Sequence, residues 1–209
     1  MNKYDNFVLI VFLCVIAITN FQLLYTNDNY QYCLHVPSIL EGEIWRILSH
    51  PFAHLSFYHL TTDVLVFLVL FRELKCYGKT PIYFLILVCW VVSSFSAMVS
   101  LPVYGISTFG GLSGINYGLL MYYCMHQALT LGGKKIQIGF FLISVLLLIS
   151  QILAGVFQMN LFENVHYGYV GRPILESHGG GILAGLIFLF FEIQLCRKNI
   201  TKKRLVVCS

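Results

Sequence analysis

The stretch TFGGLSGINYG, residues 108–118, places a single serine, Ser113, among four glycines. Gly110 and Gly111 permit a tight backbone turn, and Gly114 lets a neighbouring helix approach closely. An apolar run follows directly, so the stretch is expected to be where a loop becomes a membrane helix. The first amide groups of that helix are then unpaired, and its positive dipole end points at the serine.

The whole composition is that of a protein whose solvent is lipid. Hydrophobic residues make up 58% of the 209 positions and charged residues 11%, with a mean hydropathy of +0.78. This is too apolar for a soluble domain with a polar surface. Apolar runs near the length that crosses a bilayer as a helix lie at roughly 7–25, 55–71, 80–104, 112–131, 136–162 and 177–195. We predict an all-α membrane protein, with residues 1–209 forming one domain of six transmembrane helices.

The basic residues set the expected orientation, because cytoplasmic loops retain Lys and Arg. Eleven of the thirteen fall on one side of the predicted spans, and only Arg46 and Arg172 fall on the other. Both termini are therefore expected in the cytoplasm. The net charge of +4 then reflects topology, and no basic patch is left to predict a nucleic-acid partner.

Four ionisable side chains are unusual inside predicted spans or at their edges: His54, His59, Asp63 and His178. Each costs at least ~2.5–3.5 kcal/mol in the bilayer centre on insertion scales. His59 and Asp63 are four residues apart and share a helix face, which must look inward or into water.

The last predicted span carries His178 followed by Gly181 and Gly185, a GxxxG pattern. Such a face lets two helices touch backbone to backbone. If Gly114 of the fourth span packs there, Ser113 and His178 come to lie opposite each other. A histidine within hydrogen-bond reach takes the serine proton and makes the hydroxyl a nucleophile.

Three blocks carry a resemblance to a known family: WRILSHPFAHLSFYHLTTD at 45–63, FGGLSGINYG at 109–118 and HGGGILAG at 178–185. In this order they resemble the rhomboid intramembrane serine proteases. The resemblance implies that Ser113 attacks the scissile carbonyl and that His178 is its general base. It also implies that His59 and the Ser113 backbone N–H stabilise the oxyanion, and that Tyr117 stacks on His178.

The resemblance extends to partners and location. It implies neither a cofactor nor a metal, and a site that opens to the non-cytoplasmic side of a bacterial inner membrane. The implied substrates are membrane proteins with a single transmembrane anchor, cut near its outer end. The outer loop at residues 161–176 is expected to act as a lid.

Asp63 departs from the family pattern, which commonly has asparagine there. Two alternatives are open: a protonated Asp63 that donates a hydrogen bond as the amide would, or a carboxylate that pairs with His59 and keeps that ring charged. The acidic residue and the short chain are similar to the rhombosortase branch, which is associated with C-terminal Gly-Gly-type anchors of secreted proteins.

Three competing classes remain as alternatives. A rhomboid-like pseudoprotease would bind membrane segments without cutting them, but such proteins lack the serine or the histidine. A metal-dependent enzyme could use His50, His54 and His59, although HExxH is absent and His50 and His54 are expected to hydrogen-bond in the outer loop. A transporter is disfavoured because no duplicated half is visible.

Overall fold

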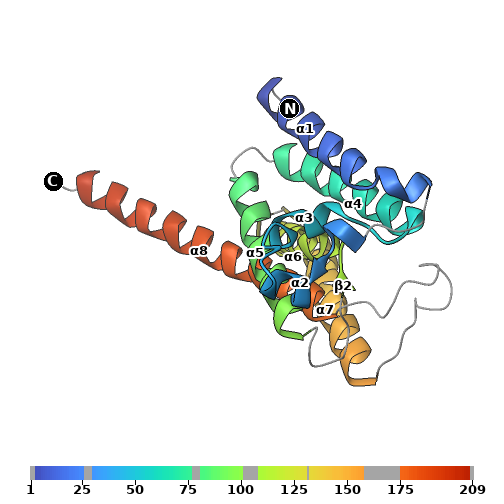
Figure 1. Cartoon of the computed structure of the whole chain (residues 1–209). Helices are drawn as coiled ribbons and strands as arrows, with labels where there is room; N and C mark the ends of the chain where they lie inside the picture. The colour runs from blue at the N-terminus through green and yellow to red at the C-terminus, as the bar shows by residue number, and fades with distance from the viewer. Residues whose placement is uncertain are drawn as a thin grey trace.

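The computed structural model describes residues 3–25, 30–76, 81–100, 108–130, 132–157 and 175–207. Its long helices (Figure 1) are α1 (Lys3–Thr19), α4 (Phe57–Cys76), α5 (Ile82–Ser100), α6 (Ser113–Thr130), α7 (Lys134–Phe157) and α8 (Leu175–Val207). Each of the six predicted apolar runs corresponds to one of these helices. Parts of those runs, at 101–104 and 158–162, and the predicted lid up to residue 174 lie outside the described residues.

Only some of the described helices meet a strict test of length and apolarity for crossing a membrane. Two pass, α5 and the segment Glu176–Leu195 of α8, and a third span results if Arg46–Phe52 and Phe57–Cys76 are joined across their 87° bend. α1, with 17 residues, covers about 25 Å. The protein is therefore an integral membrane protein, while the count of six spans stays a prediction.

α1 ends at Thr19, earlier than the predicted residue 25, and polar side chains there supplement the helix's own hydrogen bonds. The Thr19 hydroxyl and the Asn20 amide both donate to the carbonyl oxygen of Ile16, at 3.1 and 2.7 Å. A 3₁₀ turn, Phe21–Leu24, follows. The chain then leaves the α1 direction and enters the long connection to α4.

That connection is more structured than the loop expected from sequence. It contains 3₁₀ turns at Tyr30–Tyr32 and His50–Phe52, the strand β1 (Leu34–His35), and the short helices α2 (Val36–Leu40) and α3 (Arg46–Ser49). β1 pairs antiparallel with β2 (Thr108–Phe109), which directly precedes the glycine-rich stretch. The described residues are mostly helical, as expected, and this pair of two-residue strands is an addition in which the two connections satisfy each other's backbone groups.

The close packing of α6 on α8 follows the glycines, as expected. A Cβ atom at Gly181 would collide with the carbonyl oxygen of Gly114, and one at Gly185 would collide with the carbonyl oxygen of Gly118. Only glycine therefore fits on α8 at these two positions. Further along the same pair, the Tyr122 hydroxyl donates a hydrogen bond of 2.6 Å to the Glu192 carboxylate.

The long helices alternate in direction, which places their polar contacts at two ends. α4 begins near Gly111, and this end of the molecule, with Ser113, is called the site end. At the opposite end, Lys75 Nζ lies 2.7 Å from Asp5 Oδ1, and the Tyr83 hydroxyl donates to the same oxygen at 2.6 Å. The opposite end thus joins the start of α1, the end of α4 and the start of α5.

Candidate active site

The loop that carries the serine is held in a conformation that requires glycine. Gly111 has a φ of +120°, in the left-handed region, and its N–H donates to the His50 carbonyl oxygen at 2.9 Å. A Cβ atom at Gly111 would lie 2.7 Å from His59 Cε1. α6 begins at Ser113, so the serine stands at a helix N-terminus, as expected.

The serine and the histidine expected to form a dyad face each other across α6 and α8. His178 Nε2 lies 3.0 Å from Ser113 Oγ. The Tyr117 ring stacks on the His178 ring, with centroids 4.4 Å apart and planes 21° from parallel. His178 Nδ1 has no hydrogen-bond partner among the described residues. This arrangement can transfer a proton from the hydroxyl to Nε2 while the tyrosine fixes the ring plane.

The glycine at position 114 lets two further helices close around the serine. A Cβ atom there would lie 2.6 Å from Ser177 Oγ and 2.7 Å from Ser93 Cβ. Ser177 and Ser93 are both buried, on α8 and α5 respectively. The start of α6 is therefore wedged between α5 and α8, which restricts where the Ser113 side chain can lie.

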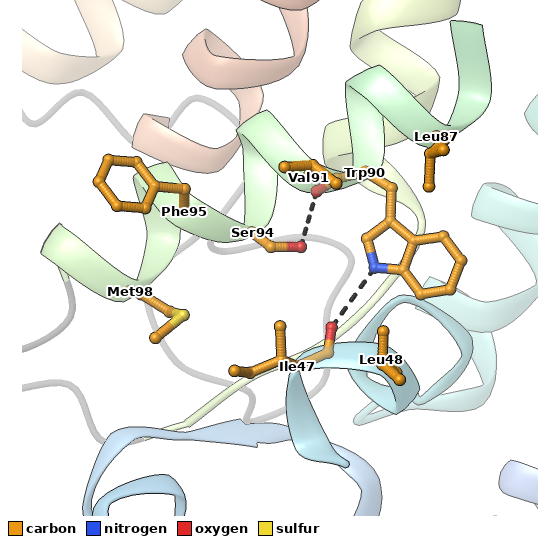
Figure 2. Close-up of a pocket in the computed structure, with 8 residues that line it drawn as sticks. All are labelled: Ile47, Leu48, Leu87, Trp90, Val91, Ser94, Phe95 and Met98. Atoms are coloured by element: carbon orange, nitrogen blue, oxygen red, sulfur yellow. Dashed lines mark hydrogen bonds between the residues drawn. The ribbon is translucent and has the colours of Figure 1, made fainter. Parts of the chain in front are cut away.

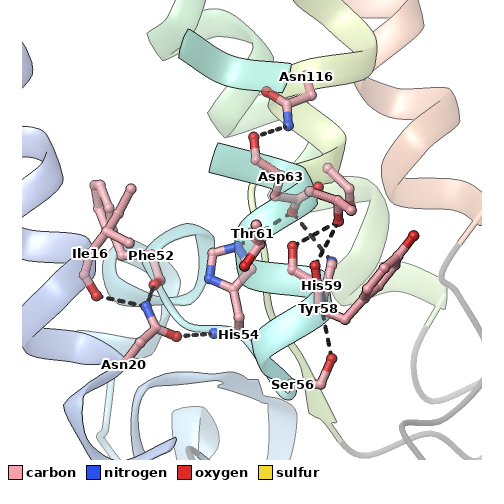
Figure 3. A network of polar contacts seen from close by, with 12 residues as sticks. Ile16, Asn20, Phe52, His54, Ser56, Tyr58, His59, Thr61, Asp63 and Asn116 are labelled. Atoms are coloured by element: carbon pink, nitrogen blue, oxygen red, sulfur yellow. Dashed lines mark hydrogen bonds and ion pairs between the residues drawn. The ribbon is translucent and has the colours of Figure 1, made fainter. Parts of the chain in front are cut away.

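A second polar cluster lies beside the dyad, at the start of α4. Asp63 Oδ2 is 3.3 Å from His59 Nε2 and 3.4 Å from His54 Nε2. The rings of the two histidines meet edge to face, with centroids 5.1 Å apart. Figure 3 shows Asp63 between them. One carboxylate oxygen thus lies near two imidazole nitrogens. It accepts a hydrogen bond from each nitrogen that carries a hydrogen.

Helix α6 is tied to this cluster through Asn116. Its Nδ2 donates to the Asp63 backbone carbonyl oxygen at 3.0 Å (Figure 3), and the Asn116 residue is buried. Asn116 is one helical turn beyond Ser113, so the bond links the nucleophile helix to the helix that carries His59 and Asp63.

His50 does not join the other two histidines. Its Nε2 lies 2.7 Å from the Ser94 hydroxyl of α5, so the expected partner within the outer loop was wrong. Arg46 does bond within that loop, donating to the carbonyl oxygens of Tyr30 and Cys33 at 2.6 and 3.1 Å. The His50–His54–His59 grouping considered for a metal is therefore split between two different sets of contacts.

An apolar pocket of about 230 Å³ lies between the first connection and α5 (Figure 2) and is separate from the dyad. Its lining residues are Ile47, Leu48, Leu87, Trp90, Val91, Ser94, Phe95 and Met98. Its polar groups are already engaged, since Trp90 Nε1 donates to the Ile47 carbonyl oxygen at 3.4 Å and Ser94 donates to the Trp90 carbonyl oxygen at 2.7 Å. The pocket offers no reacting group.

Several residues of the site end were missed by reasoning from sequence: Thr19, Asn20, Ser94, Asn116 and Ser177. A usable signal existed for Thr19 and Asn20, because two adjacent polar residues close an otherwise apolar run. Asn116 sits within the stretch that was analysed, one turn after the serine. Ser94 and Ser177 gave no signal, since a serine in a membrane helix is common and its partner is set by tertiary packing alone.

Comparison with known proteins identifies the family. Residues 41–195 match the family described as the Rhomboid domain. The rhomboid protease GlpG of Haemophilus influenzae is 27% identical over 191 residues, which cover 90% of both chains. The rhomboid protease GlpG of Serratia proteamaculans is 28% identical over 187 residues, covering 87% of this chain and 60% of that protein. For the GlpG of Yersinia pestis strain Pestoides F, 28% identity over 155 residues covers 73% of this chain and 49% of the relative.

The match to the family extends over three quarters of the sequence and includes both helices of the dyad. It also includes the cluster at the start of α4. The chain belongs to the rhomboid family of intramembrane serine proteases.

Proposed function

We propose that this protein is an endopeptidase in which Ser113 and His178 form the catalytic dyad. The observation that carries the proposal is the 3.0 Å approach of Ser113 Oγ to His178 Nε2, with Tyr117 stacked on the imidazole. Ser113 Oγ attacks the scissile carbonyl carbon while Nε2 takes the hydroxyl proton. The same proton then passes to the leaving amine, and water hydrolyses the resulting acyl-enzyme by the reverse sequence.

The oxyanion is stabilised by the Ser113 backbone N–H and by His59, with Asp63 acting through that ring. Of the two roles considered for Asp63, we favour the ion pair, because Oδ2 faces two imidazole nitrogens at 3.3 and 3.4 Å. A carboxylate in that position keeps a hydrogen on His59 Nε2. Because Asp63 engages that hydrogen, His59 acts on the developing negative charge through the positive charge of its ring. Cε1 and Nε2 of the ring border Gly111, two residues before the nucleophile.

The proposed substrates are membrane proteins with a single transmembrane anchor. A peptide bond must be extended to enter the dyad, because a regular helix engages its carbonyl groups in its own hydrogen bonds. Cleavage near the end of an anchor meets this need. The acidic Asp63 favours the rhombosortase branch, whose substrates are secreted proteins with C-terminal Gly-Gly-type anchors, and we propose these as the first substrates to examine.

We further propose one domain of six spans in a bacterial cell membrane, with both termini in the cytoplasm. The distribution of basic residues supports this orientation. Contacts between the start of α1 and the end of α4 support the alternation of helices. The dyad then opens to the non-cytoplasmic side. Fusion of a reporter that is active only in the cytoplasm to residue 209 tests the orientation, and an inactive fusion overturns it.

The dyad is tested by labelling the purified protein with a fluorescent fluorophosphonate and by cleavage of a single-span fusion substrate. The native chain is expected to be labelled and to cleave. Ser113→Ala should lose both. His178→Ala should cleave at least ~10³-fold more slowly than the native chain, and the remaining rate is what oxyanion stabilisation alone provides. Labelling that persists in Ser113→Ala contradicts the proposal. A native chain that is neither labelled nor able to cleave any anchored fusion would favour the pseudoprotease.

A further inference from the structure

The turn at residues 50–54 supports the proposed active site from two directions. On one side it meets the nucleophile loop: the Gly111 N–H donates to the His50 carbonyl oxygen at 2.9 Å, and a Cβ atom at Gly110 would lie 2.6 Å from the Ala53 carbonyl oxygen. The turn also carries His54, whose ring lies against Asp63 and His59. A shift of this turn therefore moves both the serine loop and the oxyanion cluster.

The end of α1 holds this turn on its other side through two adjacent side chains. Asn20 Nδ2 donates to the Phe52 carbonyl oxygen at 2.5 Å, and Asn20 Oδ1 accepts from the His54 backbone N–H at 2.8 Å (Figure 3). The Thr19 hydroxyl lies 2.9 Å from the same Phe52 carbonyl oxygen. Both residues are buried, Asn20 with 4% and Thr19 with 7% of its surface exposed.

These contacts are more than α1 needs to end. A helix terminus in a membrane protein can satisfy its last carbonyl groups with its own side chains, and the Asn20 amide does so at Ile16. The Thr19 hydroxyl has a single hydrogen, and the carbonyl oxygens of Val15, Ile16 and Phe52 lie 2.9 to 3.1 Å from it. The bonds to Phe52 and His54 cross 32 to 34 residues of sequence. They fix the position of one specific turn in a region where unpaired backbone groups are costly.

We propose that Thr19 and Asn20 are positioning residues of the active site, acting through the 50–54 turn on the serine loop and on the His54–Asp63–His59 cluster. This inference rests on the proposed function. α1 contributes no reacting group, yet it sets the geometry in which the other helices react. A misplacement of about 1 Å costs on the order of 100-fold in rate, so loss of these bonds is expected to act on the chemical step.

The test compares Thr19→Val, which removes the hydroxyl at constant shape, and Thr19→Ser, which keeps it, with Asn20→Leu, and uses Ser144→Ala as the matched control. The buried Ser144 hydroxyl donates to the Phe140 carbonyl oxygen of its own helix. The readout is the concentration dependence of fluorophosphonate labelling, which separates the maximal rate from the half-saturating concentration. Each variant is measured well below its own thermal midpoint, so that the folded fraction is constant.

Asn20→Leu is expected to lower the maximal labelling rate by about 10- to 100-fold with a half-saturating concentration within about twofold of the native value. Thr19→Val should show a smaller loss that Thr19→Ser restores, and Ser144→Ala should label as the native chain does. Native labelling rates in folded Asn20→Leu and Thr19→Val overturn the inference. A loss in Thr19→Val that Thr19→Ser does not restore also overturns it.

The two Thr19 variants decide the matter even if Asn20→Leu fails to fold. Labelling of Ser113→Ala at the native rate would instead overturn the proposed function. If Ser113→Ala is not labelled while the Thr19 and Asn20 variants are labelled at the native rate, only the inference about α1 is overturned.

Discussion

The Asp5–Lys75–Tyr83 cluster at the opposite end and the Ser113–His178 site bury polar side chains in different ways. At the opposite end, the single oxygen Asp5 Oδ1 receives both Lys75 Nζ and the Tyr83 hydroxyl, and Lys75 also lies 4.3 Å from the centre of the Tyr83 ring. At the site end, Ser177 Oγ and His178 Nδ1 have no hydrogen-bond partner among the described residues.

The first kind of contact, at Asp5, holds helices together. The second, at Ser113 and His178, leaves hydrogen-bonding groups available to a substrate. The Asp5 cluster has little to offer a substrate, because its carboxylate oxygen is already engaged by an ammonium group and a hydroxyl. An incompletely paired buried group costs about 1–3 kcal/mol, and such a cost is retained where the hydrogen-bonding capacity is used in another state. Changes at the site end should therefore affect rate more than stability, and changes at the opposite end should do the reverse.

Among changes that leave the dyad residues themselves intact, the largest effect is expected for Gly181→Ala, which forces α6 and α8 apart. The added methyl would collide with the carbonyl oxygen of Gly114, and the resulting displacement separates Ser113 from His178. We expect a loss of at least ~100-fold in cleavage rate, measured with a single-span fusion substrate. The matched control is Gly179→Ala on the same helix, where an added Cβ has no heavy atom within 4 Å. Equal activity in the two variants would contradict the role of the glycine contact.

Sequence reasoning succeeded for this helix pair because the constraint is one-dimensional. A glycine every fourth residue marks a helix face directly, and matching two such faces places Ser113 opposite His178. The bounds of α6 follow equally well, since apolar runs of membrane length leave few alternatives, whereas α4 continues to Cys76, past the predicted residue 71.

The supports of the site could not be predicted in this way. The contact of Thr19 with Phe52 and that of His50 with Ser94 each join segments that no local pattern relates. Asp63 was selected correctly as an unusual residue, and its spacing from His59 gave one of its neighbours. The second neighbour, His54, lies on the turn before α4, and its direction depends on the bend between α3 and α4, which no periodicity encodes.

The next largest effect is expected at Asp63. Its variants distinguish a carboxylate that accepts hydrogen bonds from a protonated Asp63 that donates one. Asp63→Leu removes the acceptor for both His54 and His59 and should lower the maximal cleavage rate by about 10- to 100-fold, less than removal of a direct oxyanion donor costs. Asp63→Asn keeps an acceptor oxygen but not the charge, so its cleavage rate should fall between those of the native chain and Asp63→Leu.

The control for Asp63 is Thr62→Val, whose hydroxyl bonds to the carbonyl oxygens of Tyr58 and His59 within α4. It should cleave within about twofold of the native rate. A native rate in Asp63→Leu would show that the carboxylate does not act on catalysis. An Asp63→Asn variant as active as the native chain would favour the protonated, donating alternative.

The smallest effect on activity is expected at the opposite end, in Asp5→Asn. This change leaves Lys75 without its ionic partner, while the asparagine oxygen still accepts from the Tyr83 hydroxyl, so the helices remain in contact. We expect about 1–3 kcal/mol of lost stability, seen as a thermal midpoint lower by several degrees, with a cleavage rate within about twofold of native below that midpoint. The rate is preserved because Asp5 is separated from Ser113 by most of the length of α4, about 28 Å at 1.5 Å per residue. A cleavage rate that falls 10-fold in folded Asp5→Asn would mean that the two ends are coupled, and the division between a holding end and a reacting end would fail.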